Sequence, residues 1–573
     1  MVRFGLQVLV FAWVVWLASL SVVQAEAPRP MRPLVWLGVK NFQRLEQRVT
    51  ETAQLMKIPG MAPVVLGVLN LQWGGFQGLD RQRPIAMVMP TLVPVENPPF
   101  VLVIPYSHEP TLRSTLQRLF PPSTAQSDRL ILRGRFGQRV GRFDASAKVL
   151  LVAPTLTLLN GVEIDLPGDV FAAPEGEESG PDVVLRVEAA AAKTRYPAEW
   201  NAWLAALMQG GRQGRDRALA ASKTVAETNF VLFAYDVLER RQLQMWHDLD
   251  QVEIRITFAP GGWDARLEMR WQPQSATAAW VNLQRHATTL TPLFSQQRGI
   301  RMAASLRQPD TWQHDMQMLL SLAQRVVESH LAEDRHLTSE QRTAYRTGIH
   351  TGFDVAAYML AGSSVEIAAE IPSGQALARP ALKTDMTGWI GLPQSAEHLE
   401  SLLNIASSFA TTVPAPIGLT RHVAHHHGTP LHRLSPVPGE SSASLFLAAE
   451  ESLLAWHVGP SPVALMQVLD RRRKPAQTLV FPRPQKKNIL HLECPISFCF
   501  ELLQYAQPKA SRDELGTAAQ WLRGVTTPML LEVTPQPNAA TLHWVLPQAL
   551  LQGVADVLRQ HIVQTLRQSL LGY

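Results

Sequence analysis

The chain of 573 residues has only two cysteines, and after the run Phe4–Val23 it has no long uncharged apolar segment. A helix needs about 20 consecutive apolar residues to cross a bilayer, so the lack of later runs argues against a body embedded in a membrane. Gly-x-Ser-x-Gly and Ser-x-x-Lys, two local patterns of serine nucleophiles, are also missing. These absences favour a soluble body and give no sequence support for a serine hydrolase.

Basic residues interleaved with aromatics, the arrangement that contacts nucleic acid, are lacking as well. The chain has 53 Lys and Arg against 48 Asp and Glu, a net charge of +5 that is small for this length. The glycines of Gly74–Gly78 precede a strand-like run, whereas those of a dinucleotide fingerprint follow a strand. The sequence therefore predicts no nucleic-acid partner and no cofactor.

The N-terminus has the three parts of a secretory signal peptide. Arg3 precedes the apolar run, and the Val-Gln-Ala sequence that ends at Ala25 supplies a small-residue cleavage site. We therefore expect residues 1–25 to be a signal peptide, a mature chain that begins near Glu26, and export to the periplasm, the cell envelope or the exterior. The alternative is an uncleaved N-terminal membrane anchor, because the run is also about long enough to span a bilayer.

Three weak internal echoes occur in the same order along the chain. IPYSHEPTLRSTL from Ile104 and LPQSAEHLESLL from Leu392 share Pro, Ser and Glu at matching spacings. FDASAKVLLVAP matches AAEESLLAWHVGP, and VEIRITF with LEMRWQPQ matches the segment LLEVTPQPNAATLHWVLPQ. The repeated order predicts a tandem duplication, with residues 26–300 and 301–573 as two related halves.

A resemblance to known proteins rests on three of these segments. GLDRQRPIAMVM, the helix PYSHEPTLRSTL and the segment SLFLAAEESLLAWHVGPSPVALMQVL together resemble a group of exported bacterial proteins of unknown function with two related α+β halves. The resemblance covers most of the mature chain and implies antiparallel sheets, each covered by helices. It implies no assigned activity, cofactor or catalytic residue. The expected fold class is therefore α+β, built from a duplicated domain.

Hydrophobic periodicity predicts individual elements within each half. In the first half we expect a helix over 39–57, strands over 85–89 and 100–104, and a helix over 109–120 capped by Ser107. In the second half we expect a hairpin of 355–361 with 365–371, a strand over 386–392, and a helix over 395–410 capped by Ser395. Thr338 and Gln341 have the spacing of a capping box at the start of a further helix.

The densest polar feature is the histidine cluster RHVAHHHGTPLHRL. Its candidate metal ligands are His422, His425, His426, His427 and His432. Alternation along a strand would put His422 and His426 on one face and His425 and His427 on the other, so a shared metal would require a bend. The favoured interpretation is a hairpin that turns at residues 428–430, with the imidazoles lining its solvent face.

Cys494 and Cys499 have three possible roles. They form a disulfide if export places them in an oxidising compartment and their Cα atoms lie about 4.4 to 6.8 Å apart. Alternatively they are two buried thiols, or they bind a metal together with His491. Two buried thiols are the favoured interpretation.

No motif of catalysis stands out, so the favoured function is a non-catalytic exported binding or scaffold protein, with an envelope protein or polymer as its partner. A hydrolase-type enzyme whose site forms only in three dimensions is the first alternative, and a metal-binding protein that uses His422–His432 is the second. The C-terminal segment 548–570 is predicted to be an amphipathic helix packed on the second half. Its expected apolar stripe is Leu551, Val554, Leu558, Ile562 and Leu566.

Overall fold

The computed structural model describes residues 33–55, 77–90, 100–119, 124–126, 129–134, 137–161, 180–259, 261–285, 299–307, 309–361, 364–372, 386–391, 394–412, 417–436, 444–473, 488–497, 520, 522, 525 and 527–557. The expected signal peptide lies outside these residues. Among the helices that the structure describes, none has the length and apolar character needed to cross a membrane. Helices and antiparallel strands are mixed along the chain, which confirms the α+β class.

Contacts divide the chain into two compact units that are not sequential. Unit 1 contains residues 1–207, 249–271 and 545–573, and unit 2 contains residues 208–248 and 272–544. Relative to the two halves expected from the sequence, the segments 208–248 and 272–300 join unit 2 and the segment 545–573 joins unit 1.

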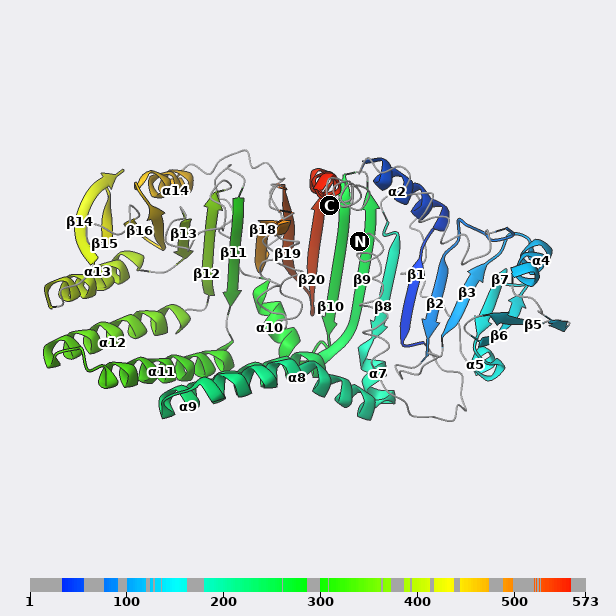
Figure 1. The fold of residues 1–573 in the computed structure, drawn as a ribbon, viewed down its shortest axis with the longest axis horizontal. Coiled ribbons are helices and arrows are strands. Elements are labelled where there is room, and N and C mark those ends of the chain that lie inside the picture. The colour runs from blue at the N-terminus through cyan, green and yellow to red at the C-terminus, as the bar shows by residue number, and fades with distance from the viewer. Residues whose placement is uncertain are drawn as a thin grey trace, which may run out of the picture. The chain divides into compact units, whose positions relative to one another are not determined.

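The strands of unit 1 form an antiparallel sheet (Figure 1). They are β1 (Val35–Val39), β2 (Ile85–Met89), β3 (Val101–Pro105), β4 (Thr124–Gln126), β5 (Arg129–Gly134), β6 (Gly137–Asp144), β7 (Val149–Ala153), β8 (Val183–Glu188), β9 (Leu249–Ala259) and β10 (Gly262–Trp271). Neighbouring strands follow the order β4-β5-β6-β7-β3-β2-β1-β8-β9-β10.

Unit 2 contains a second set of antiparallel strands, of which only the last residues of β20 fall in unit 1. They are β11 (Gly299–Arg307), β12 (Ser364–Pro372), β13 (Met386–Gly391), β14 (Ile417–His426), β15 (Thr429–Pro436), β16 (Ser444–Glu450), β17 (Leu453–Gly459), β18 (Leu490–Pro495), β19 (Pro528–Gln536) and β20 (Ala539–Pro547). Their order is β14-β15-β16-β17-β13-β12-β11-β18-β19-β20. Each strand therefore takes the place of the strand ten labels earlier in unit 1.

The sheet of unit 1 is buried on both faces around β7. Leu150 and Val152 pack with α2 (Phe42–Leu55) and α4 (Glu109–Leu119), whereas Leu151 and Ala153 pack with Leu159 of α5 (Leu156–Gly161). Because alternate side chains of a strand point to opposite faces, a strand covered on both faces is apolar at every position. The uninterrupted apolar sequence of β7 reflects this double burial.

Unit 2 repeats this layering. Leu399 and Leu403 of α13 (Ser395–Thr412) pack with Leu454 on one face of the sheet. On the other face, Leu465 and Leu469 of α14 (Val463–Arg473) belong to the same core cluster as the fully buried Trp389. The strand and helix expected over 386–392 and 395–410 are therefore confirmed to within two residues at each end.

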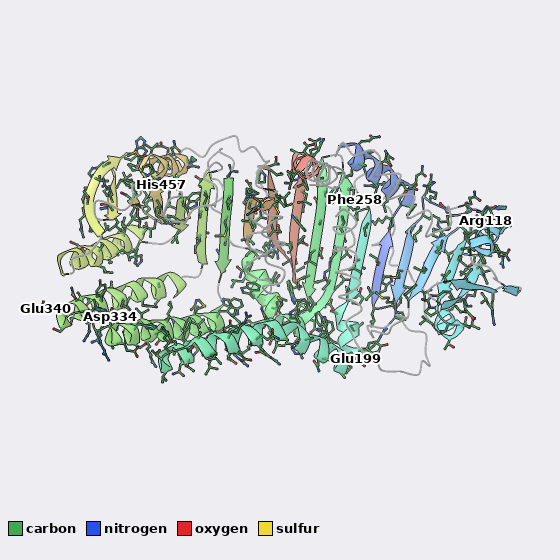
Figure 2. All side chains as sticks on the ribbon, viewed as in Figure 1. Arg118, Glu199, Phe258, Asp334, Glu340 and His457 are labelled. Atoms are coloured by element: carbon green, nitrogen blue, oxygen red, sulfur yellow. The ribbon has the colours of Figure 1, made fainter. Side chains whose placement is uncertain are left out.

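Long helices lie between strands in two places among the described residues. After β8 the chain forms α7 (Ala189–Arg195), α8 (Pro197–Ala221) and α9 (Val225–Asp248), and after β11 it forms α11 (Asp310–Glu333) and α12 (Ser339–Ala361). In unit 2, α9, α11 and α12 lie side by side (Figure 1). Figure 2 labels Asp334 and Glu340 near the turn between α11 and α12.

The start of α12 is confirmed, but the predicted hairpin strand over 355–361 is wrong. Thr338 and Gln341 form the expected capping box, with their side chains bonded to each other's backbone N–H at 3.2 and 2.9 Å. The helix then continues to Ala361. A short apolar run fits a buried strand and a helix equally well. The pattern of apolar residues over 355–361 therefore could not distinguish a strand from a helix. The partner strand is confirmed as β12.

The predicted caps of α4 and α13 are also corrected. The Ser107 hydroxyl donates to the carbonyl of Gly78 at 3.3 Å, and the Ser395 hydroxyl donates to the carbonyl of Glu451 at 3.0 Å. At α4 it is His108 whose Nδ1 accepts the N–H of Thr111, at 3.4 Å. Each serine therefore ties its helix to a loop instead of capping it.

The C-terminal segment is helical over its described part, residues 548–557, but it packs in unit 1 and not with the second half. Its N–H at Gln548 donates to the carbonyl of Gly261 at 3.0 Å, in the turn between β9 and β10. Leu550 and Ala555 are fully buried, whereas Leu551 and Val554 of the expected stripe are only partly buried. The rest of that stripe lies outside the described residues.

Candidate metal centre

The histidine cluster forms a hairpin, as the sequence predicts. β14 and β15 pair antiparallel, and the connecting turn is His427-Gly428, one residue earlier than expected. Both turn residues have a left-handed backbone, with φ of 52° at His427 and 88° at Gly428. Positive φ at both central residues is the requirement of a tight hairpin turn, and it directs the His427 side chain away from the regular alternation.

A bulge in β14 changes the grouping of the other imidazoles. The register shifts between Thr420 and Ala424, so β14 has three residues there opposite the single residue His432. His422 is the middle one and has φ of 54°. A bulge re-aims side chains, which is why the predicted faces were wrong. His422 joins His425 and His432, whereas His426 joins His427.

The face of the hairpin toward α14 brings two imidazoles to one carboxylate. Nε2 of His426 and Nε2 of His427 lie 2.8 and 3.1 Å from Oδ1 of Asp470. One ligand atom from each of the three residues lies within 4.8 Å of the others. The hydrogen bond from His426 lowers the pKa of Asp470, so this carboxylate is ionised at neutral pH. The side chains of Asp470 and His427 are about half exposed and open to solvent.

The arginines that follow Asp470 hold this end of α14 in place. Arg471 pairs with Glu370 of β12 at 3.3 Å. Arg473 donates to the carbonyl of His427 at 3.2 Å and pairs with Glu450 of β16. The arginines at the C-terminal end of α14 therefore anchor this helix to the hairpin turn. These contacts fix Asp470 opposite His426 without occupying the two imidazoles.

The opposite face of the hairpin, toward α13, carries the other three histidines. The ring centroids of His422 and His425 are 5.6 Å apart, and those of His422 and His432 are 5.0 Å apart. His432 pairs across the sheet with Leu447, which packs against α13. His422 and His425 are exposed, whereas His432 is 1% exposed. The hairpin thus separates its histidines into two groups.

A third cluster of ionisable groups lies inside the sheet of unit 2. The two imidazole nitrogens of His491 lie 3.1 Å from Glu493 and 2.9 Å from Glu532, and Glu493 also pairs with Arg301 at 2.8 Å. Burial disfavours the imidazolium, but the hydrogen bonds to both carboxylates outweigh it and raise the pKa of His491 to about 9. Because both nitrogens are occupied, this histidine is an ion-pair partner and a poor metal ligand.

The position of His491 bears on one of the three roles considered for the cysteines, a metal site that includes this histidine. Cys494 is buried in β18, three residues after His491, so the two side chains point to opposite faces of the strand. That geometry speaks against a metal shared by these two residues. Cys499 lies outside the described residues, and the disulfide stays a prediction.

The surface pocket found in unit 1 has a volume of about 280 Å³. It is lined by Gln77, Pro110, Thr111, Ser114, Thr115 and Arg118, the last of which is labelled in Figure 2. Arg118 is its single ionisable lining residue. General acid–base catalysis requires a positioned proton donor or acceptor, and this pocket supplies none.

Asp470 is the residue of the candidate centre that sequence reasoning missed. It lies in α14, 44 positions after His426 in the sequence. The sequence spacing of His426 and Asp470 does not indicate this contact, because the contact forms only when the strands pair. No protein-family model matches this chain, and no curated protein or solved structure shows significant similarity to it.

Proposed function

We propose that this chain is a non-catalytic binding protein and that it takes a divalent transition-metal ion at His426, His427 and Asp470. The observation that carries the proposal is the convergence of two imidazoles and one carboxylate within 4.8 Å. Imidazole nitrogen with carboxylate oxygen suits Zn²⁺, Ni²⁺ and Cu²⁺, whereas Mg²⁺ and Ca²⁺ prefer oxygen ligands alone.

The arrangement of these ligands favours binding over catalysis. Three protein ligands leave one position of a tetrahedral ion open to water or to a metal-bound small ligand. The half-exposed side chains allow the ion to exchange with solvent. Catalytic metal sites instead lie in shaped cavities that exclude water, whereas the side chains of His427 and Asp470 are about half exposed.

A tandem duplication is the second part of the proposal. Its main support is the identical strand order of the two sets, β1–β10 and β11–β20. The left-handed turn residues Lys148 and Glu451 occupy matching turns, and their carbonyls accept N–H groups of Tyr106 and Ser395. The two segments of the first sequence echo follow matching strands, since one leads from β3 into α4 and the other from β13 into α13.

The last helix of each strand set gives independent support for the duplication. α10 (Ala276–Gln284) follows β10 but belongs to unit 2, and the helical residues after β20 belong to unit 1. In unit 2, Asn282 of α10 bonds to Asn538 in the β19–β20 turn at 2.7 Å. In unit 1, Gln548 bonds to Gly261 in the β9–β10 turn. Each unit therefore contains the helix that follows the strand set of the other unit. We expect such an exchange when two copies of one ancestral unit are joined in one chain.

Export from the cytosol completes the proposal. Its support is the charged, apolar and small-residue sequence over 1–25, together with the lack of a described helix that could cross a membrane. In an envelope compartment the hairpin would meet metal ions, and a protein or polymer of the envelope is the partner that we propose for the body.

The metal site is tested by titrating Zn²⁺ into tag-free protein and measuring the affinity by calorimetry. We expect Asp470→Asn to weaken binding at this site at least about 100-fold, because losing a ligand costs more than the 10–100-fold loss typical of outer-shell changes. Asp334→Asn, a surface change at the end of α11, is the matched control and leaves the affinity unchanged. Equal affinities of the Asp470→Asn and parent proteins would contradict the proposal.

A further inference from the structure

We infer that His422, His425 and His432 form a second transition-metal site on the other face of the same hairpin. The chain would then bind two ions, one toward α14 and one toward α13. This inference deepens the proposed function, and it stands on a separate set of residues. The ligand set is three imidazoles, whereas the first site has two imidazoles and a carboxylate.

The spacing of the rings suits coordination of one ion. A metal held about 2.0–2.1 Å from each imidazole nitrogen keeps two tetrahedrally placed ring centroids roughly 5 Å apart. The ring centroid of His422 lies 5.0 Å from that of His432 and 5.6 Å from that of His425. Ligand atoms already converge within 4.8 Å at His426, His427 and Asp470, whereas an ion beside His432 requires the exposed rings of His422 and His425 to rotate toward it.

The buried imidazole supplies an unsatisfied ligand atom. His432 is 1% exposed, and its Nδ1 is buried without a hydrogen-bond partner. An unpaired buried polar atom is costly, and a bound ion would relieve that cost. The ring centroid of His432 lies 5.0 Å from that of His422, so a further imidazole stands directly beside the ring that carries this unpaired nitrogen.

The backbone at His422 is a second sign of a built site. This residue has φ of 54° in the middle of the bulge opposite His432. A left-handed backbone is uncommon for residues other than glycine, although histidine adopts it more readily than most, and such conformations cluster at active sites and ligand-binding positions. Without the bulge, regular alternation would separate His422 from His425.

A positive charge beside this group is paired with a carboxylate of α13. Arg421 is the fixed cation beside the site, and Glu400 of α13 pairs with it at 3.1 Å. Its repulsion of a metal ion is thereby reduced.

The test is the number of ions bound per chain. Tag-free protein is equilibrated with Zn²⁺, and metal and protein are quantified after dialysis at low micromolar free ion. We expect two ions for the parent chain, one for Asp470→Asn, one for the double change His422→Ala with His425→Ala, and none for the combined variant. The changed histidines are exposed, so folding is retained, and far-UV circular dichroism checks this. His330→Ala on α11 is the control and still binds two ions.

Each result separates the two sites. If the double histidine change leaves the Asp470→Asn protein with one ion, the second site does not exist and the first proposal is unaffected. If Asp470→Asn changes nothing while the double change removes an ion, the site toward α14 fails and the site toward α13 stands. As a further readout, Cu²⁺ at the all-imidazole site gives an electron paramagnetic resonance spectrum with coupling to three nitrogens, and the double change abolishes that spectrum.

Discussion

The edge hairpins of the two strand sets occupy the same place and carry different chemistry. β4 and β5 contain no histidine, whereas β14 and β15 contain four and their turn contains a fifth, His427, and the second hairpin is also longer. An edge strand has one neighbour and exposed side chains, so its sequence is free to change without disturbing the core. The two strand sets therefore share their strand order, whereas the histidines that we propose as metal ligands belong to the second hairpin.

A second matched position lies inside the sheets. In the first strand set Arg186 of β8 pairs across the sheet with Glu253 of β9, and their side chains are joined at 2.6 and 2.7 Å. In the second set His491 of β18 stands opposite Glu532 of β19. Both pairs place a base opposite an acid on equivalent strands. In the first set the acid Glu253 joins a second base, Arg255, whereas in the second set the base His491 joins a second acid, Glu493.

The largest difference between the two pairs should appear when the acid is removed. Glu253→Gln takes away the carboxylate that Arg186 contacts at two nitrogens, and breaking a buried ion pair costs about 3–5 kcal/mol. Glu532→Gln leaves His491 paired with Glu493, so we expect a smaller loss of about 1–3 kcal/mol. Urea denaturation of the two variants measures both values. Equal losses would show that Glu493 does not compensate.

Raising the pH should affect the second strand set and spare the first. The pKa of His491 is about 9 in the folded protein against 6.5 as its ordinary value, so its stabilising contribution is complete below pH 6.5 and is lost as the pH rises through about 9. The difference between these two pKa values corresponds to a contribution to the unfolding free energy on the order of 3 kcal/mol. Arginine stays protonated over this range, so the pair in the first set has no such dependence.

The measurement is the unfolding free energy at pH 7 and at pH 10, for the parent chain and for His491→Gln. The parent should lose more stability than the variant between these two values. On the acid side, the bonds to His491 and Arg301 lower the pKa of Glu493 despite its burial, so its contribution is present above pH 4.5 and is lost as the pH falls. Parallel pH profiles of the two proteins would refute the assignment.

The smallest expected effect is stabilisation by metal. An ion that binds only the folded hairpin adds about 2.7 kcal/mol at a free concentration one hundred times its dissociation constant. Zn²⁺ should therefore raise the melting temperature of the parent chain. The combined Asp470→Asn, His422→Ala and His425→Ala variant should melt at the same temperature with and without Zn²⁺. A shift in that variant would place the binding on residues outside the histidine hairpin.

Local elements were predictable where the pattern was regular. The helix over 109–120 and the strand over 85–89 appear as α4 and β2, because hydrophobic periodicity reports the face that a segment buries. The capping box at Thr338 was also readable, since its two hydrogen bonds join residues only three apart. The failure at 355–361 has the same origin, because a short apolar run carries no period that separates a strand from the end of a helix.

The sequence by itself determined the α+β class, the histidine hairpin and the individual helices and strands that rest on contacts between near neighbours. Only the tertiary structure decided which histidines meet, because the bulge at His422 and the left-handed turn at His427 override the alternation of a regular strand. It also brought Asp470 to the hairpin and placed the C-terminal helix in unit 1. These contacts join residues far apart in the chain, and their pairing is set by packing and sheet register, which no local pattern encodes.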